Sequence, residues 1–281
     1  MAFFRSERDA RTVSPGGNFS AFARKSYVRG EAGDGIRCGR RRLALRTWDS
    51  ASRAGDGGRV ICRGSRSIPS MKLEPETLRQ LVERTLGHYH ARAEAFWEGT
   101  RNHDVEQNIE ALLRHIQSVA PYSILDFGCG PGRDLKTFVQ RGHRAIGLEG
   151  AAALAQMART HSGCEVWQQD FVDLDLPEGH FDGVFANASL FHVPRQELPR
   201  VLRQLHATLK PGGVLFSSNP RGNNEESVNG ERYGAYYDLA AWREYLAAAG
   251  FAELEHYFRP QGLPIEQQPW LASVWRKADC R

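Results

Sequence analysis

Residues 123–132, with the sequence SILDFGCGPG, decide the fold. The first five residues are a short, largely apolar run of the kind that forms a buried strand. Glycine then occupies every second position, at 128, 130 and 132. Glycines let the backbone turn tightly and let a ligand approach it closely, and a helix that follows such a loop offers unpaired N–H groups. The stretch therefore predicts a strand, a ligand-binding loop and a helix in direct succession.

Strands and helices alternate through the rest of the chain. After the strand at 123–127 we expect six more, at residues 144–148, 165–169, 181–186, 214–218, 253–258 and 270–275. Helical spacing of apolar residues separates several of them, at 151–161, 196–209 and 239–249, and two further helical patterns, from 74 and from 104 to Pro121, precede the first strand. This alternation predicts an α/β fold with a doubly wound, seven-stranded, mostly parallel sheet and N-terminal helices.

The first 70 residues differ in composition from the rest. They hold 14 Arg, 10 Gly and 9 Ser and carry a net charge of +9, whereas residues 71–281 carry −5, which together give the formal +4 of the chain. Because they show no sustained helical or strand period, we expect a disordered extension over 1–70 and one domain over 71–281. Three explanations remain open: a transit peptide, an RNA-binding tail, or an upstream extension that is not natively translated. The position of Met71 favours the last.

Composition excludes several classes of protein. No window approaches the roughly 18 consecutive apolar residues that a membrane-spanning helix needs. The five cysteines are scattered and never form C-x-x-C, so we expect no disulfide framework, no metal site and a reduced, cytoplasmic protein. Because the basic excess is confined to residues 1–70, we expect no nucleic-acid partner for the domain. The sequence leaves the oligomeric state open.

Acidic residues follow three successive predicted strands. Asp126 lies two residues before the first glycine of the loop, Glu149 lies 23 residues further on, and Asp170-Phe171 follows the third strand. The carboxyl ends of parallel strands meet at one edge of the sheet, so we expect these side chains to converge. A dinucleotide loop would need a third glycine where Arg133 stands. The pattern favours S-adenosylmethionine instead, with Glu149 on the ribose hydroxyls and Asp170 and Phe171 on the adenine.

Five motifs resemble the successive motifs of class I S-adenosylmethionine-dependent methyltransferases. They are DFGCGPG (126–132), GLEG (147–150), QQDF (168–171), FDGVFANASLFHV (181–193) and LKPGGVLFSSNPRG (209–222), within a resemblance that covers about residues 86–277. The resemblance implies a Rossmann-like fold and methyl transfer from S-adenosyl-L-methionine. It also implies a set of cofactor-binding residues: Asp126, Gly128, Cys129, Gly130, Gly132, Glu149, Asp170, Phe171 and Asn187.

Three segments resemble a narrower family, the methyltransferase half of the bifunctional ovothiol-biosynthesis enzymes. They are YHARAEAFWEGTR (89–101), FANASLFHVP (185–194) and QQPWLASVWRK (267–277). This resemblance implies N-methylation of 5-thiohistidine (4-mercaptohistidine). The other half of those enzymes carries an iron site of the form H-x-x-x-H-x-E, which this sequence lacks. The resemblance therefore implies the methylation step alone.

The acceptor is expected to be a small, amino-acid-like molecule. An N-P-P-Y type motif is absent after the fourth strand, which argues against base-amine or protein-glutamine targets. We expect Arg221 to hold an acceptor carboxylate and Tyr233, with Tyr236 and Tyr237, to form an aromatic lid on a Gly- and Asn-rich loop. His192 is the candidate base, although a neutral imidazole nitrogen needs none before attack. The expected acceptor-binding residues are Phe191, Asn219, Arg221 and Tyr233. The alternatives are a methyltransferase of another small metabolite and, more distantly, an NAD-type oxidoreductase or an RNA-binding protein.

Overall fold

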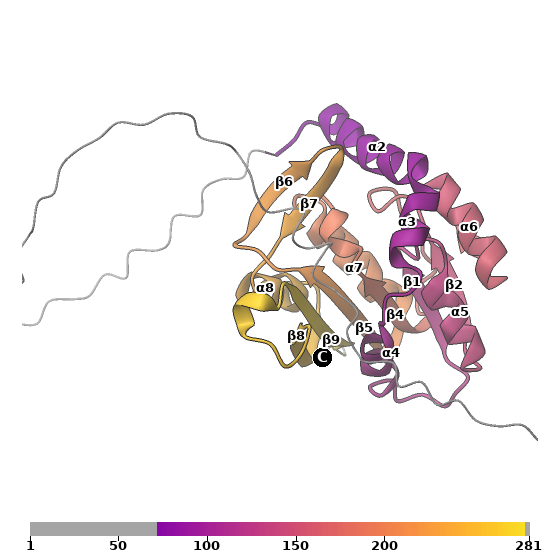
Figure 1. The fold of residues 1–281 in the computed structure, drawn as a ribbon. Helices are drawn as coiled ribbons and strands as arrows, with labels where there is room; N and C mark the ends of the chain where they lie inside the picture. Colours follow the sequence, from indigo (N-terminus) through magenta and orange to yellow (C-terminus); the bar gives the residue numbers. More distant parts are fainter. Residues whose placement is uncertain (1–71, 279–281) are drawn as a thin grey trace, which may run out of the picture. The chain divides into compact units, whose positions relative to one another are not determined.

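The computed structural model describes residues 72–278, and the expected extension over 1–70 lies outside these residues. The ribbon in Figure 1 shows an open, twisted sheet with helices on both of its faces. No helix within 72–278 is long and apolar enough to cross a membrane.

Seven strands form the sheet in the order β3-β2-β1-β4-β5-β9-β8. The first five strands along the chain pair in parallel, and β9 runs antiparallel between β5 and β8. Their bounds are β1 Ser123–Phe127, β2 Arg144–Leu148, β3 Val166–Trp167, β4 Phe181–Asn187, β5 Leu209–Pro220, β8 Phe251–Arg259 and β9 Trp270–Lys277. The predicted fold is confirmed. The strand order reverses beside β1, and in such sheets the carboxyl edge at the reversal is where ligands bind.

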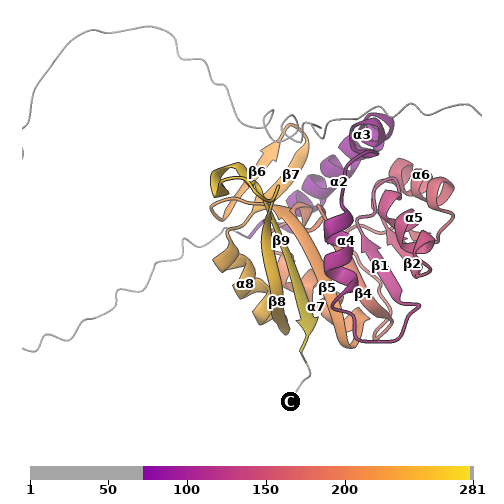
Figure 2. The ribbon, with the colours of Figure 1, turned by 60° about the horizontal axis from the view of Figure 1, so that its bottom comes forward.

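Two layers of helices cover the sheet, because successive residues of a strand point to opposite faces. One face packs against α4 (Glu106–Leu113), α5 (Arg133–Gln140) and α6 (Ala152–Ser162) through buried residues such as Ile124 and Phe185. The other packs against α7 (Leu198–Thr208) and α8 (Leu239–Ala248) through Leu125 and Val184. Figure 2 shows α4 in front of the strands and α7 behind them.

The helices α2 (Pro75–Ala91) and α3 (Ala93–Thr100) lie at the carboxyl edge of the sheet, where α2 runs beside α6 and β7 (Figure 1). Two side-chain hydrogen bonds hold this N-terminal part in place. The backbone N–H of Tyr233 donates to Thr85 Oγ1 at 3.0 Å, and that of Leu73 donates to Gln196 Oε1 at 2.7 Å. The helix α2 thereby covers the loops that follow β1 to β4.

Three local predictions are wrong. The helix expected from 104 to Pro121 ends at Leu113, and of the apolar residues beyond it Ile116 packs in the core while Val119 is 92% exposed. The third strand has two residues rather than five. The loop expected to carry three tyrosines is an antiparallel hairpin of β6 (Glu225–Asn229) and β7 (Arg232–Tyr236), closed by a tight turn in which Gly230 has a φ of +64°.

Candidate active site

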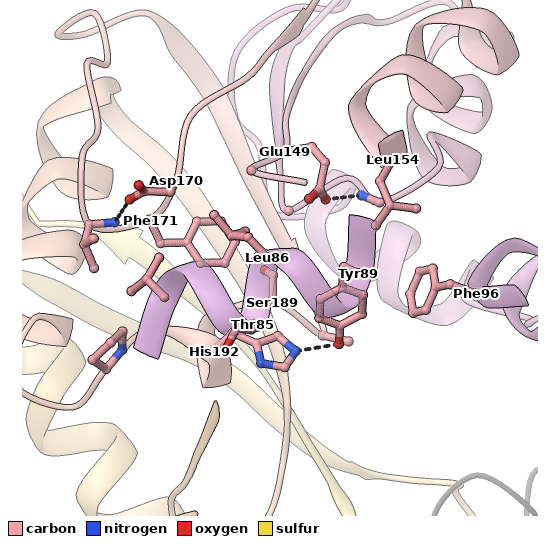
Figure 3. A pocket seen from close by; sticks show the side chains of 17 residues that line it. Thr85, Leu86, Tyr89, Phe96, Glu149, Leu154, Asp170, Phe171, Ser189 and His192 are labelled. Atoms are coloured by element: carbon pink, nitrogen blue, oxygen red, sulfur yellow. Dashed lines mark hydrogen bonds between the residues drawn. The ribbon is translucent and has the colours of Figure 1, made fainter. Parts of the chain in front are cut away.

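A cavity lies at the carboxyl edge of the sheet, under α2 (Figure 3). Each of the loops after β1, β2, β3 and β4 contributes to it, and helices α2 and α3 supply the opposite wall. The lining residues are Val82, Thr85, Leu86, Tyr89, Phe96, Gly128, Gly130, Glu149, Gly150, Leu154, Asp170, Phe171, Val172, Ala188, Ser189, His192 and Pro194. The convergence of three predicted strand ends on one cavity follows from the parallel pairing of these strands.

The glycine loop after β1 shapes the floor of the cavity. Gly128, Gly130 and Gly132 all have positive φ, at +77°, +55° and +84°. A Cβ on Gly128 would lie 2.5 Å from the Ser189 Cβ, and one on Gly132 would lie 2.8 Å from the Ala158 Cα. A Cβ on Gly130 would have only Phe96, itself a lining residue, within 4 Å, at 3.4 Å. The first and third glycines therefore permit close packing, and Gly130 keeps the cavity free of side-chain atoms.

Glu149 joins the end of β2 to this loop. Its Oε2 accepts a hydrogen bond from the Gly130 N–H at 3.0 Å, and its Oε1 accepts one from the Ala151 N–H at 2.8 Å, as Figure 3 shows in part. Burial raises the pKa of the carboxyl to about 7, and these backbone N–H groups oppose the rise. The group therefore takes up or loses a proton near neutral pH.

Asp126 belongs to a buried polar cluster beside the cavity rather than to its lining. Its Oδ2 has no hydrogen-bond partner, and burial together with the neighbouring Asp134 raises its pKa well above the usual range. Asp134 forms a two-pronged ion pair with Arg133, at 2.7 and 3.0 Å. Asn187 donates to Asp134 Oδ2 at 3.3 Å and accepts from Asn108 Nδ2 at 2.9 Å. The sequence analysis did not predict that Asn108 and Asp134 belong to this cluster. It considered Arg133 only because a dinucleotide-binding loop would have glycine at that position.

Asp170 and Phe171 line the cavity at the end of β3. Asp170 Oδ1 accepts a hydrogen bond from the Val172 N–H at 2.7 Å, which closes a tight turn (Figure 3). The Phe171 ring stacks on Phe127, with centroids 4.4 Å apart and planes at 19°. Cys129 is buried, and burial raises the pKa of its thiol well above the usual range, so this thiol is a packing group.

His192 lies in the short helix η1 (Leu190–His192), and its two ring nitrogens have different roles. Its Nδ1 is 2.7 Å from the Tyr233 carbonyl oxygen, which can only accept, so Nδ1 carries the hydrogen. Its Nε2 therefore carries a lone pair, which accepts a hydrogen bond from the Tyr89 hydroxyl at 2.8 Å (Figure 3). Burial lowers the pKa of the imidazole to about 4, so the ring is neutral. The sequence analysis did not include Tyr89 among the site residues.

The four residues expected to bind the acceptor lie outside the lining of the cavity. The Phe191 ring is 3.9 Å from that of His192 between centroids, and the Arg221 guanidinium lies over Phe258, 4.8 Å from the ring centroid. Asn219 is 4% exposed, and neither its Nδ2 nor its Oδ1 has a hydrogen-bond partner. Of the four, only Phe191 contacts a lining residue through a ring contact.

Tyr233 holds the hairpin rather than covering the cavity. Its hydroxyl donates to Glu226 Oε1 at 2.5 Å and accepts from the Arg195 N–H at 3.0 Å. Tyr233 and Tyr237 are each 4% exposed and pack in the core, so the predicted three-tyrosine lid does not form. Tyr233 reaches the site through its backbone: its carbonyl oxygen fixes the His192 ring, and its N–H donates to Thr85.

Comparison with known proteins places this geometry in a class. Residues 124–213 match the family model of a methyltransferase domain. An uncharacterized methyltransferase from Anoxybacillus flavithermus is 26% identical over 179 residues, covering 61% of this chain and 84% of that protein. A trans-aconitate 2-methyltransferase from Azoarcus sp. is 33% identical over 162 residues, covering 51% and 62%. The structure of the Burkholderia thailandensis 1,6-didemethyltoxoflavin-N1-methyltransferase superimposes with a TM-score of 0.61 at 21% identity, covering 75% and 94%.

The order of the sheet, the cavity and the match of residues 124–213 to a methyltransferase domain support a class I methyltransferase. The family match and the S-adenosylhomocysteine-bound structural neighbour indicate S-adenosyl-L-methionine as its cofactor. The residues present fit this cofactor, because Gly130 leaves the cavity free of side-chain atoms and the buried Asp126 Oδ2 is an acceptor without a partner. The class-level resemblance is confirmed, and the dinucleotide interpretation is not supported. The narrower resemblance to the ovothiol-biosynthesis enzymes stays a prediction.

Proposed function

We propose that the enzyme transfers a methyl group from S-adenosylmethionine to a ring nitrogen of a thiol-bearing imidazole amino acid, for which 5-thiohistidine is the reference acceptor. One observation carries the proposal. Two of the three segments that resemble the ovothiol-biosynthesis methyltransferase converge on the cavity, although they lie about 90 residues apart. Segment 89–101 contributes Tyr89 and Phe96, and segment 185–194 contributes Ala188, Ser189, His192 and Pro194.

The cofactor would be held mainly by the loops after β1, β2 and β3. The ionised Glu149 would accept hydrogen bonds from the ribose hydroxyls, and the unpartnered Asp126 Oδ2 would accept one from the ammonium group of the cofactor. Asp170 and Phe171 would contact the adenine. Gly128 and Gly130 allow close approach, Cys129 and Gly132 shape the loop, and Asn187 orients the polar cluster. When bound, S-adenosylmethionine supplies an electrophilic methyl group on a sulfonium centre.

The chain's own contribution to the reaction is alignment of the acceptor, exclusion of water and removal of a proton. Residues of α2 form one wall of the cavity, and this helix would limit the access of water to the reacting groups. A neutral imidazole nitrogen already presents a lone pair, so no strong base is needed before attack. The proton that the methylated ring loses would pass toward the Tyr89–His192 pair, because the His192 Nε2 lone pair accepts from the Tyr89 hydroxyl.

A second candidate is O-methylation of a small carboxylate. It is favoured by the trans-aconitate 2-methyltransferases among the relatives, from Azoarcus sp. and Methylobacterium nodulans, at 33% and 31% identity. A carboxylate acceptor would need a cation and no base. Both candidates are small molecules, and they differ in the atom that receives the methyl group.

Incubation of the full chain with S-adenosylmethionine and three separate acceptors tests the proposal. The acceptors are 5-thiohistidine, histidine and trans-aconitate, and mass spectrometry with fragment analysis locates the methyl group. We expect a ring-N-methylated thiohistidine and no product from histidine. A methyl ester of trans-aconitate as the preferred product would establish the second candidate, and S-methylation of thiohistidine would contradict the proposed nucleophile. The Gly130→Val variant, which fills the cavity, is the inactive control.

A further inference from the structure

A one-directional chain of hydrogen bonds runs from Tyr89 to the backbone of the β6–β7 hairpin, and Arg232 of that hairpin lies beside its first donor. Burial raises the pKa of the Tyr89 hydroxyl, and the nearby Arg232 guanidinium, which can only donate hydrogen bonds, opposes the rise. The Tyr89 hydroxyl donates to His192 Nε2, and His192 Nδ1 donates to the Tyr233 carbonyl oxygen. Every donor in the chain points away from Arg232. The Tyr89 oxygen therefore keeps a lone pair for the guanidinium, and no group of this hydrogen-bond chain neutralises the charge of Arg232.

Arg232 has no acidic partner among residues 72–278. Its neighbour Glu231 is 3.8 Å from His88 instead, and the Nε of Arg232 is buried without a hydrogen-bond partner. Burial, and then the charge of Arg232, lower the pKa of His88, and burial keeps His192 neutral. A half-buried cation without an acidic partner is costly unless an anion joins it, because burial removes much of its hydration.

The surroundings of Arg232 form an aromatic wall next to the cavity. Arg232, Gly234 and Tyr236 alternate along β7 and share one face of the hairpin. A Cβ on Gly234 would lie 2.5 Å from the Tyr236 Oη, so the Tyr236 ring extends back along the strand toward Arg232. The Phe191 ring lies 6.2 Å from that of Tyr236 between centroids and contacts His192, which lines the cavity. A flat ring held in the cavity could therefore place a charged substituent at Arg232.

We propose that Arg232 is the cation that binds the carboxylate of the acceptor and that Tyr89 positions it for this contact. The inference deepens the proposed function and rests on it. It assigns to Arg232 the role that the sequence suggests for Arg221, whose guanidinium lies over Phe258 and away from the cavity lining. The planar guanidinium fork suits a carboxylate in two-pronged contact.

Two acceptors and three variants test the assignment. The acceptors are 5-thiohistidine and its decarboxylated analogue, a thiol-bearing imidazole ethylamine, and the variants are Arg232→Gln, Arg232→Lys and the matched control Arg221→Gln. We expect Arg232→Gln to raise KM for the carboxylate acceptor about 10- to 100-fold, since a hydrogen bond to a charged group is lost. The same variant should change KM for the analogue less than about threefold, Arg232→Lys should recover part of the loss, and Arg221→Gln should leave both values near the wild type.

Binding measurements separate failure of this inference from failure of the proposed function. Isothermal titration of S-adenosylhomocysteine should give equal affinity for all variants, and a loss in Arg232→Gln would assign the residue to the cofactor instead. Equal KM penalties for the two acceptors, or a selective penalty in Arg221→Gln, would overturn the assignment. If the wild type methylates neither acceptor, the proposed function fails. Titration of trans-aconitate into the S-adenosylhomocysteine complex then decides whether Arg232→Gln loses carboxylate binding, as the inference requires.

Discussion

Protonation of Glu149 should make both stability and cofactor affinity depend on pH. The carboxyl is buried, and its pKa is raised from an ordinary 4.5 to about 7. Below pH 4.5 the folded and unfolded states are both protonated, and the group has no effect. Between 4.5 and 7 the unfolded chain binds fewer protons than the folded one, so the free energy of unfolding falls as pH rises. At about 1.4 kcal/mol per unit, the accumulated loss is about 3 kcal/mol, and it stays constant above pH 7.

Denaturant unfolding of the wild type and of Glu149→Gln isolates this contribution. Gln has nearly the same shape as Glu but does not titrate, so other groups largely cancel in the difference between the two proteins. We expect the wild-type free energy of unfolding, relative to the variant, to fall by about 3 kcal/mol between pH 4.5 and 7. If the difference in free energy of unfolding between the two proteins is constant across this interval, the pKa of Glu149 is not raised. If the difference grows with pH, the pKa is lowered instead.

Cofactor binding should show the opposite trend. The ionised Glu149 is the form that accepts the ribose hydroxyls, so affinity for S-adenosylhomocysteine should rise by up to about tenfold per pH unit below 7 and then level off. Calorimetry near pH 6, in two buffers of different ionisation enthalpy, should detect release of close to one proton on binding. Glu149→Gln should bind about 10- to 150-fold more weakly above pH 7 and release no proton. Unchanged affinity in this variant would remove Glu149 from the ribose site.

Three further substitutions have distinct expected outcomes. Gly130→Val should abolish S-adenosylhomocysteine binding in calorimetry. The control Gly142→Val, also at positive φ but with no atom near its Cβ, should bind normally and lose only about 1–2 kcal/mol of stability. Equal affinities of the two variants would show that position 130 does not border the cofactor. Tyr233→Phe should lower the free energy of unfolding by about 1 kcal/mol in denaturant titration, because the Arg195 N–H loses its acceptor and the exposed Glu226 loses a donor. A rise in KM without destabilisation would show instead that Tyr233 contacts the acceptor. Tyr89→Phe removes the donor that holds the neutral imidazole, so the pKa of His192, about 4 in the wild type, should rise in an NMR titration; no change would break the proposed hydrogen-bond chain.

The sheet could be predicted closely from the sequence because its central strands are buried on both faces. Such strands appear as continuous apolar runs between turns, and the expected ranges 123–127 and 144–148 coincide with β1 and β2. The hairpin could not be predicted in this way. All five residues of β6 are exposed, so no apolar period distinguishes this strand from a loop.

The candidate site likewise has one part that could be predicted from the sequence and one part that could not. Glu149, Asp170 and Phe171 converge because each lies in a loop that follows a parallel strand, and the edge at which such loops meet depends only on topology. Tyr89 and Arg232 meet through the packing of α2 on β7, across more than 140 residues of sequence, and no local pattern records that contact. Arg221 also follows a strand, β5, but its guanidinium lies over Phe258, because topology places the backbone of such a residue and not the direction of its side chain.

The cavity combines a floor within residues 124–213, which the methyltransferase model matches, with a roof from α2 and α3 that lies outside that range. The wall that carries Arg232 also lies outside it. In evolutionary terms, the two halves of the site can diverge independently, because changes in the roof or the hairpin leave the sheet intact. Homologues that keep the floor can thus share a methyl donor while their acceptors differ. The acceptor of a newly sequenced relative is better inferred from its counterparts of residues 75–100 and 225–237 than from overall identity.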